Sequence, residues 1–319
     1  MILASLKILS PLILKWLSKK LFYLVAMTKR ISELSTAERL NFLLTNRIPR
    51  RTLTQFMGWY SKINSPLLTR LSIKVWRLFA SDLDLSEAKK THFNSLHDCF
   101  IRELKEGLRP IDYRKEIVSS PSDGIVGACG TIKDGIVYQA KGFPYDLDEL
   151  LQDSELATKL KNGTYLTIRL KSSMYHRFHA PVAAEVNEVN YISGDTWNVN
   201  PIALKQIEKL YCKNERAILK LNTEQADHHI VVVPVAAILV ASMKFHCLTE
   251  VLDLKYKGPN KITCSAHYEK GEEMGYFQHG STIIIFASSQ YQLCNGILTG
   301  KTVKMGQALL TERCHIAEI

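Results

Sequence analysis

The chain has 319 residues, 46% of them hydrophobic, which is enough for one large core or two smaller domains. Its net charge of +10 is uneven, because residues 1–110 hold nineteen Lys and Arg against eight Asp and Glu, whereas residues 111–319 are nearly neutral. This excess of positive charge predicts a polyanionic partner, either nucleic acid or an anionic membrane. The seven cysteines include no C-x-x-C pair, which disfavours a zinc ribbon or a thioredoxin-like site.

Residues 1–30 favour the membrane over nucleic acid as the partner. Their apolar side chains recur at helical spacing, at Ile2, Leu6, Leu9, Ile13, Trp16 and Leu17. Lysines interrupt the apolar run, so a simple membrane span is disfavoured. We expect an amphipathic helix that lies on the membrane surface. A cleaved signal or mitochondrial presequence and a weak transmembrane anchor remain alternatives.

Residues 31–110 predict a helical, basic, membrane-facing domain. Thr36 is a suitable N-cap for a first helix, and Ile48-Pro49 interrupts the pattern. Apolar residues at helical spacing predict a second helix over 53–60 and a third over 67–79. The third carries Arg70, Lys74 and Arg77 on its polar side. This face is either simply solvated or in contact with phospholipid, and the neighbouring apolar segment favours the second interpretation.

After Pro110 the chain changes to short β-type runs and turns, which predicts a mostly antiparallel β domain over 111–319. The turn Lys133-Asp134-Gly135 predicts a hairpin between strands at 125–132 and 136–140. Further strands are expected at 165–170, 186–192, 217–221, 230–240, 283–287 and 302–305. No G-x-G-x-x-G follows a strand, so a nucleotide-binding α/β fold is disfavoured. The fold class is therefore α+β.

Three clusters in the β domain carry residues that are able to do chemistry. The first is the turn 120–124 (Ser-Pro-Ser-Asp-Gly), which contains Asp123. The second is the segment 175–181, with His176 and His179. The third, 271–282, ends in Gly280-Ser281-Thr282 just before an apolar run. Each cluster alone has an ordinary structural explanation as a turn or a surface loop.

Together, Asp123, His179 and Ser281 are a charge-relay set if the fold brings them into contact. The G-x-S-x-G elbow of α/β-hydrolases is absent. A metal site is disfavoured, because the H-x-x-H of His176 and His179 supplies two ligands and no third is spaced to join them.

An ordered series of motifs then resembles the phosphatidylserine decarboxylase proenzymes of the bacterial and mitochondrial type. It begins with the segment 93–111, which is similar to F-N-x-F-F-x-R-x-L-K-x-G-x-R-P-I. It continues with S-P-x-D-G at 120–124, Q-x-K-G at 139–142, Y-H-R-x-H-x-P at 175–181, N-E-R at 214–216, V-P-V at 233–235, K-G-x-E-x-G at 270–275 and G-S-T at 280–282. The series covers roughly residues 45–310, and its order and spacing are far more specific than any single motif. Leu96 and His279 depart from the family pattern.

The resemblance implies a chain that cleaves itself between Gly280 and Ser281. The products are a β chain, 1–280, and an α chain, 281–319, that stay together, with a higher oligomer left open. In this scheme His179, oriented by Asp123, deprotonates Ser281, which attacks the carbonyl of Gly280. Ser281 then becomes a covalent pyruvoyl cofactor. Because His279 lies beside the scissile bond, we expect it to alter the cleavage rate rather than abolish it.

The same resemblance implies the reaction, a decarboxylation of phosphatidylserine to phosphatidylethanolamine and CO2. The pyruvoyl group forms a Schiff base with the serine amine and accepts electrons as CO2 leaves. His176 is the candidate proton donor, and neither a metal nor a nucleic acid is involved. We expect a membrane-associated, peripheral protein on the bacterial inner membrane, with the mitochondrial inner membrane as the alternative.

Other functions remain open from the sequence. A related pyruvoyl enzyme would act on another serine phospholipid or on a soluble amino acid, which the membrane-directed N-terminus disfavours. A lipoyl-type carrier domain would need a carrier lysine motif, which is absent. A serine hydrolase using Asp123, His179 and Ser281 would leave the chain intact.

Overall fold

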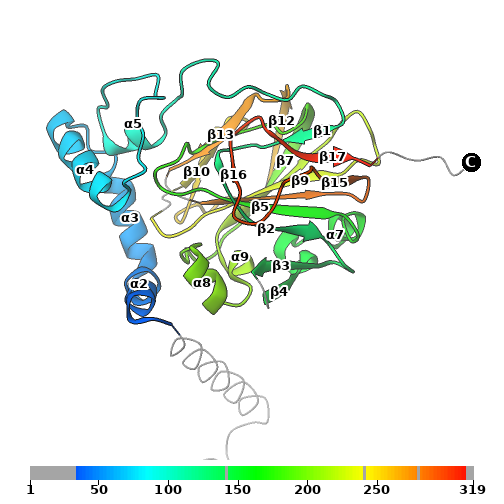
Figure 1. Cartoon of the computed structure of the whole chain (residues 1–319), viewed down its shortest axis with the longest axis horizontal. Coiled ribbons are helices and arrows are strands. Elements are labelled where there is room, and N and C mark those ends of the chain that lie inside the picture. Colours follow the sequence, from blue (N-terminus) through cyan, green and yellow to red (C-terminus); the bar gives the residue numbers. More distant parts are fainter. Residues whose placement is uncertain (1–33, 141–142, 240–241, 279–280, 314–319) are drawn as a thin grey trace, which may run out of the picture.

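The computed structural model describes residues 34–140, 143–239, 242–278 and 281–313, in which helices precede a β-sheet body (Figure 1). The first helices are α2 (Thr36–Asn46), α3 (Arg50–Tyr60), α4 (Pro66–Phe79) and α5 (Leu96–Phe100). They confirm the helices predicted over 53–60 and 67–79, whereas residues 80–95 and 101–110 of the predicted helical domain contain no helix. The membrane-associating segment 1–30 lies outside the described residues.

The caps of these helices follow from local sequence. Ser35, and not the predicted Thr36, is the N-cap of α2: its hydroxyl accepts from Glu38 N–H, and the Glu38 carboxylate accepts from Ser35 N–H. Thr36 is the first helical residue instead. In α4, Pro66 occupies the first turn and the hydroxyl of Ser65 accepts from Leu68 N–H.

The body is built on an eight-stranded antiparallel sheet in the order β12-β7-β8-β9-β14-β5-β2-β16. Its strands are β2 (Gly124–Thr131), β5 (Thr164–Arg169), β7 (Ala184–Ile192), β8 (Arg216–Leu221), β9 (Ile230–Val235), β12 (Lys261–Tyr268), β14 (Thr282–Ala287) and β16 (Thr302–Val303). The predicted mostly antiparallel β domain is thus confirmed, although the strand expected at 230–240 ends at Val235.

Smaller sheets and short helices complete the body. One sheet has the order β1-β17-β15, a second β11-β10-β13-β6, and a third pairs β3 with β4. Their strands are β1 (Ile117–Ser119), β3 (Ile136–Ala140), β4 (Phe143–Asp146), β6 (Arg177–His179), β10 (Ser242–Phe245), β11 (Val251–Asp253), β13 (Glu273–Phe277), β15 (Tyr291–Leu293) and β17 (Ala308–Glu312). The helices are α6 (Leu147–Leu151), α7 (Ser154–Lys159), α8 (Pro201–Gln206) and α9 (Leu210–Lys213).

The predicted hairpin around residue 134 is only half right. The turn is present, because Lys133 and Ile136 exchange backbone hydrogen bonds and both Asp134 and Gly135 have positive φ. However, β3 pairs with β4, whereas β2 runs between β5 and β16. The partners of β2 come from distant parts of the chain, which a local turn signal does not reveal.

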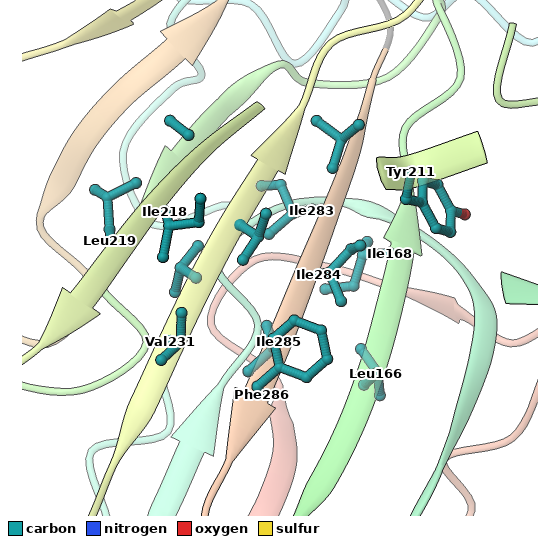
Figure 2. Close-up of a cluster of buried hydrophobic side chains, with 14 of the residues drawn as sticks. Leu166, Ile168, Tyr211, Ile218, Leu219, Val231, Ile283, Ile284, Ile285 and Phe286 are labelled. Atoms are coloured by element: carbon teal, nitrogen blue, oxygen red, sulfur yellow. The ribbon is translucent and has the colours of Figure 1, made fainter. Parts of the chain in front are cut away.

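The core is centred on β14, directly after Ser281. Its six residues are all buried and lie between β5 and β9 (Figure 2). Such a strand, covered on both faces, reads as a continuous apolar run rather than an alternating one. By contrast, β12 at the sheet edge alternates between exposed and half-buried residues over most of its length.

Polar contacts attach the helical segment to the β body. Arg50 of α3 forms an ion pair with Asp195 at 2.6 Å, and its guanidinium stacks on the ring of Trp197. Thr54 of the same helix accepts from Leu239 N–H at 3.0 Å. These bonds place α3 beside the loop that follows β9.

Candidate active site

The three chemical clusters of the sequence meet through backbone hydrogen bonds. The His179 N–H donates to the Pro121 carbonyl at 2.8 Å, which joins the second cluster to the first. The Phe277 N–H donates to the His176 carbonyl at 3.0 Å, which joins the second cluster to the third. The second contact continues the pairing of β6 with β13. Segments that lie about 150 residues apart therefore form one site.

Ser281 lies at the entry to the central strand. Its carbonyl accepts from Leu170 N–H at 2.9 Å, and its side chain is fully buried. Its hydroxyl has no hydrogen-bond partner within the part of the chain that the structure describes. A buried hydroxyl without a hydrogen-bond partner is energetically unfavourable, so the surroundings of Ser281 are not arranged to satisfy this group. Gly280 and His279, on the other side of the scissile bond, lie outside the described residues.

His179 is buried, and its environment keeps the ring neutral. Its Nδ1 donates to the carbonyl of Gly271 at 2.9 Å, so Nε2 accepts the hydrogen bond from the Tyr175 hydroxyl, also at 2.9 Å. Burial lowers the pKa of His179, and the Gly271 carbonyl opposes this only in part. The ring thus has the tautomer and charge that a general base requires.

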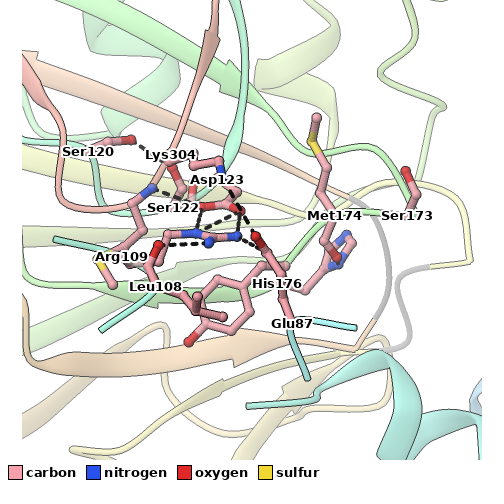
Figure 3. Close-up of polar contacts among 12 residues, drawn as sticks. Glu87, Leu108, Arg109, Ser120, Ser122, Asp123, Ser173, Met174, His176 and Lys304 are labelled. Carbon is pink, nitrogen blue, oxygen red and sulfur yellow. Dashed lines mark hydrogen bonds and ion pairs between the residues drawn. The ribbon is translucent and has the colours of Figure 1, made fainter. Parts of the chain in front are cut away.

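Asp123 is paired with an arginine in this conformation (Figure 3). Arg109 Nε and Nη2 donate to the two carboxylate oxygens at 2.8 and 2.6 Å, and the Met305 N–H adds a third bond at 2.9 Å. Arg109 also bonds Glu87 at 2.6 Å. No hydrogen bond joins Asp123 to His179 among the described residues, so the predicted charge relay stays a prediction.

His176 lies on the same segment as His179 but in a separate environment. Its side chain is fully buried, and Nδ1 donates to the Met174 carbonyl at 2.7 Å. The ring packs against Phe100 of α5 with centroids 4.2 Å apart. This contact brings the predicted proton donor to the border between the β body and the helical segment.

Sequence reasoning missed the arginines that hold this site together. The buried Arg102 donates to the carbonyls of Ser173 and Met174, which fixes the chain just before His176. Arg177 donates to both carboxylate oxygens of Glu273 and so ties β6 to β13. Arg102, Arg109 and Arg177 all lie inside the quoted motifs, so the motif letters were a usable signal for them.

The described residues contain no group of three His, Cys, Asp or Glu side chains placed to hold a metal ion. Within the same ranges, no helix is long and apolar enough to cross a membrane.

Comparison with known proteins agrees with the motif series. Residues 96–311 match the family model described as phosphatidylserine decarboxylase. This chain belongs to the phosphatidylserine decarboxylase family, whose members are carboxy-lyases. A phosphatidylserine decarboxylase proenzyme of Haemophilus influenzae is 34% identical over 287 residues, which is 85% of this chain and 96% of that protein. The resemblance inferred from the motifs is therefore confirmed.

Other relatives with the same name match over a similar share of the chain. The proenzyme of Brevibacillus brevis is 32% identical, and the match covers 85% of this chain and 97% of that protein. The proenzyme of Vibrio parahaemolyticus is 32% identical, and the match covers 81% of this chain and 94% of that protein. The decarboxylase match thus spans both the helical segment and the β body.

Proposed function

We propose that the chain is a proenzyme that cleaves itself at Gly280-Ser281 and then decarboxylates phosphatidylserine at a membrane surface. The observation that carries the proposal is the buried Ser281 hydroxyl just before β14, which has no hydrogen-bond partner among the described residues. The proenzyme names of the relatives support it. The helical segment 31–110 would face the membrane, and the β domain 111–319 would carry out the chemistry.

Self-cleavage uses the chain's own residues. His179 takes the proton of the Ser281 hydroxyl after its Nε2 exchanges Tyr175 for that hydroxyl. The oxygen attacks the carbonyl carbon of Gly280, a C–O bond forms, and the peptide C–N bond breaks to give an ester and a free amine. Loss of the Ser281 α-proton then breaks the Cβ–O bond, which releases the carboxylate of Gly280. Tautomerisation and addition of water release ammonia and leave a keto group at position 281.

Asp123 contributes to this step by charge. In the conformation described, Arg109 and Met305 hold its carboxylate, so Asp123 acts on His179 through space. A direct Asp123–His179 bond would require the Arg109 pair to rearrange. Met305 belongs to the future α chain, so this carboxylate also links the two products of cleavage.

The pyruvoyl group at position 281 would supply a carbonyl that accepts electrons from a substrate amine. The structure favours this group because position 281 is buried and no described side chain competes for its oxygen. His176, packed on Phe100, would deliver a proton to the substrate carbon after CO2 leaves. Its fixed ring orientation, through the Met174 carbonyl, suits a directed proton transfer.

The substrate's bilayer is the occupant we propose for the exposed apolar surface of α2, α3 and α4. This surface consists of Leu40, Leu43, Leu44, Phe56, Trp59, Leu67, Leu71, Val75, Leu78 and Phe79, each at least 42% exposed. Large exposed apolar patches mark interaction sites. The positive charge of residues 1–110 suits an anionic lipid surface. Peripheral association with the bacterial inner membrane fits the bacterial relatives.

Cavities offer a path from this surface to the site. An apolar cavity of about 400 Å³ lies among α3, α4 and α5. A second cavity of about 720 Å³ shares Phe100, Ser172 and Leu239 with it and is also lined by Leu170, the hydrogen-bond partner of Ser281. Acyl chains would occupy the first cavity, and the head group the second.

Replacing the nucleophile tests the proposal. We expect Ser281→Ala to stay at full length and to release no CO2 from phosphatidylserine, because the alanine can neither attack Gly280 nor form the keto group. Intact-mass analysis and a radiolabelled CO2 assay measure the two outcomes, with the wild-type chain as control. Turnover by the uncleaved alanine variant would sink the proposal. A serine hydrolase would instead lose activity in this variant although the wild type is uncleaved.

A further inference from the structure

The cavity beside Ser281 contains an arginine that the mechanism does not use. Arg169 is the last residue of β5, and it pairs with Thr282, the residue that follows Ser281. It lines the 720 Å³ cavity together with Leu170 and Phe100. Arg169 is thus next in sequence to Leu170, whose N–H donates to the carbonyl of Ser281.

Among the described residues, no acidic side chain pairs with the guanidinium of Arg169. Neither a hydrogen bond nor an ion pair of this group occurs in the ranges that the structure describes. The other basic residue that lines the cavity, Lys171, is already compensated by Asp82 at 2.9 Å. The cavity therefore carries a net positive charge, and that charge belongs to Arg169.

Burial makes this unpaired charge costly. Desolvation lowers the pKa of Arg169, although an arginine stays protonated at neutral pH. Buried charges in proteins are usually paired, because the lost hydration is otherwise not replaced, and Arg169 is partly buried. An anion that enters the cavity would restore this pairing, and the planar guanidinium fork matches the oxygens of a phosphate group.

We infer that Arg169 binds the phosphodiester of the phospholipid substrate. The inference rests on the proposed function and adds a specificity-determining residue to it. With acyl chains among α3, α4 and α5 and the amine at position 281, the phosphodiester falls between them, in the cavity that Arg169 lines. The carboxylate that leaves as CO2 is better placed away from a cation, because pairing would stabilise it before reaction.

The test compares Arg169→Gln with Arg114→Gln, a matched change at an exposed arginine that pairs with Asp112 outside the cavity. Both variants should cleave themselves, because cleavage needs no phosphate, and cleavage also reports correct folding of β5 and β14. In mixed micelles of neutral detergent and phosphatidylserine, Arg169→Gln should raise KM by about tenfold to a hundredfold with a smaller change in kcat, as expected for a lost charged hydrogen bond. Arg114→Gln should behave as wild type.

Inhibition by phosphatidylethanolamine identifies the group that Arg169 contacts, because this product keeps the phosphate and lacks the carboxylate. Weaker inhibition of Arg169→Gln, by a factor similar to its rise in KM, supports the phosphate. Unchanged inhibition with a raised KM assigns the carboxylate instead and overturns the inference. A KM within twofold of wild type overturns it as well and leaves the proposed function standing.

Arg169→Lys covers the case in which the glutamine variant does not cleave. It keeps the charge but loses the planar fork, so both KM and the inhibition constant should rise several-fold. Wild-type values for both constants would overturn the inference. A wild-type chain that releases no CO2 would overturn the proposed function, and this inference with it.

Discussion

At the scale of single residues, His179 differs from an ordinary surface histidine in both hydrogen bonding and burial. The Gly271 carbonyl fixes its tautomer, and burial lowers its pKa. A base with a lowered pKa stays neutral, and so competent, to a lower pH than an unperturbed imidazole, whose pKa is about 6.5.

The proposed role of His179 predicts both a mutant and a pH profile. His179→Ala should slow self-cleavage at least about a hundredfold, because the serine loses its base. In the wild type the cleavage rate should remain at its plateau as the pH falls to 6.5 and decline only below it. Time courses of chain cleavage in freshly synthesised protein measure both. Efficient cleavage by His179→Ala would remove this residue as the base.

Glu215 of the N-E-R motif predicts a pH effect on stability. It is 1% exposed, it accepts from the Tyr191 hydroxyl at 2.6 Å, and burial raises its pKa from 4.5 to about 7. The folded chain therefore binds the proton more tightly than the unfolded chain. The contribution of Glu215 to the free energy of unfolding is fully present below about pH 4.5. It is lost as the pH rises through about 7, and the loss is on the order of 3 kcal/mol.

Glu215→Gln should remove this pH dependence, since the amide resembles the protonated acid and does not ionise. Denaturant unfolding between pH 4.5 and 8 measures the difference. Both proteins, the one that keeps Glu215 and the Glu215→Gln variant, carry Ser281→Ala so that they stay uncleaved. Equal slopes of stability against pH in the two proteins would contradict this account of Glu215.

The residue types of the site could be predicted from the sequence, but their pairings could not. Motif order pointed to Asp123, His179 and Ser281, and the fold brings their segments together. The partner of Asp123 is Arg109, which belongs to a different motif, the segment 93–111. No local sequence pattern encodes the packing that brings this segment against the turn 120–124. Hydrogen-bond partners depend on tertiary contacts, so they appear only in the structure.

At the scale of elements, the helices and the continuous apolar runs were predicted, whereas several strands were missed, including the eight-residue β12 at the sheet edge. The apolar run of β14 and the periodic α3 and α4 were predicted close to their bounds. The three-residue β6 and the four-residue β10 were missed, because their length leaves too little pattern to detect. These short strands nevertheless carry the pairing that joins His176 to the segment before Ser281.

The exposed apolar surface of α2, α3 and α4 predicts membrane binding at this scale. A triple change of Leu67, Leu78 and Phe79 to Asn should weaken binding to phosphatidylserine vesicles by about tenfold or more, because these side chains are 80–85% exposed and free to enter the bilayer. Leu298→Asn is the matched control, an exposed leucine on the β body. Cosedimentation at low salt measures both. Equal binding of the triple variant and wild type would exclude this surface.

At the scale of the whole molecule, cleavage at Gly280-Ser281 would not separate the two chains. The future α chain supplies β14 between β5 and β9, and it also supplies β17, which pairs with β1. Residues 283–286 are fully buried, so removing this strand would expose the centre of the core. We therefore expect the chains of residues 1–280 and 281–319 to form one folded body.

Mass spectrometry of the purified, active protein tests the central claim most directly. Under native conditions a single species should contain both chains. Under denaturing conditions it should separate into residues 1–280 and 281–319, with a keto group in place of the N-terminal amine at position 281. A protein that releases CO2 from phosphatidylserine and still gives one chain of 319 residues would contradict the account.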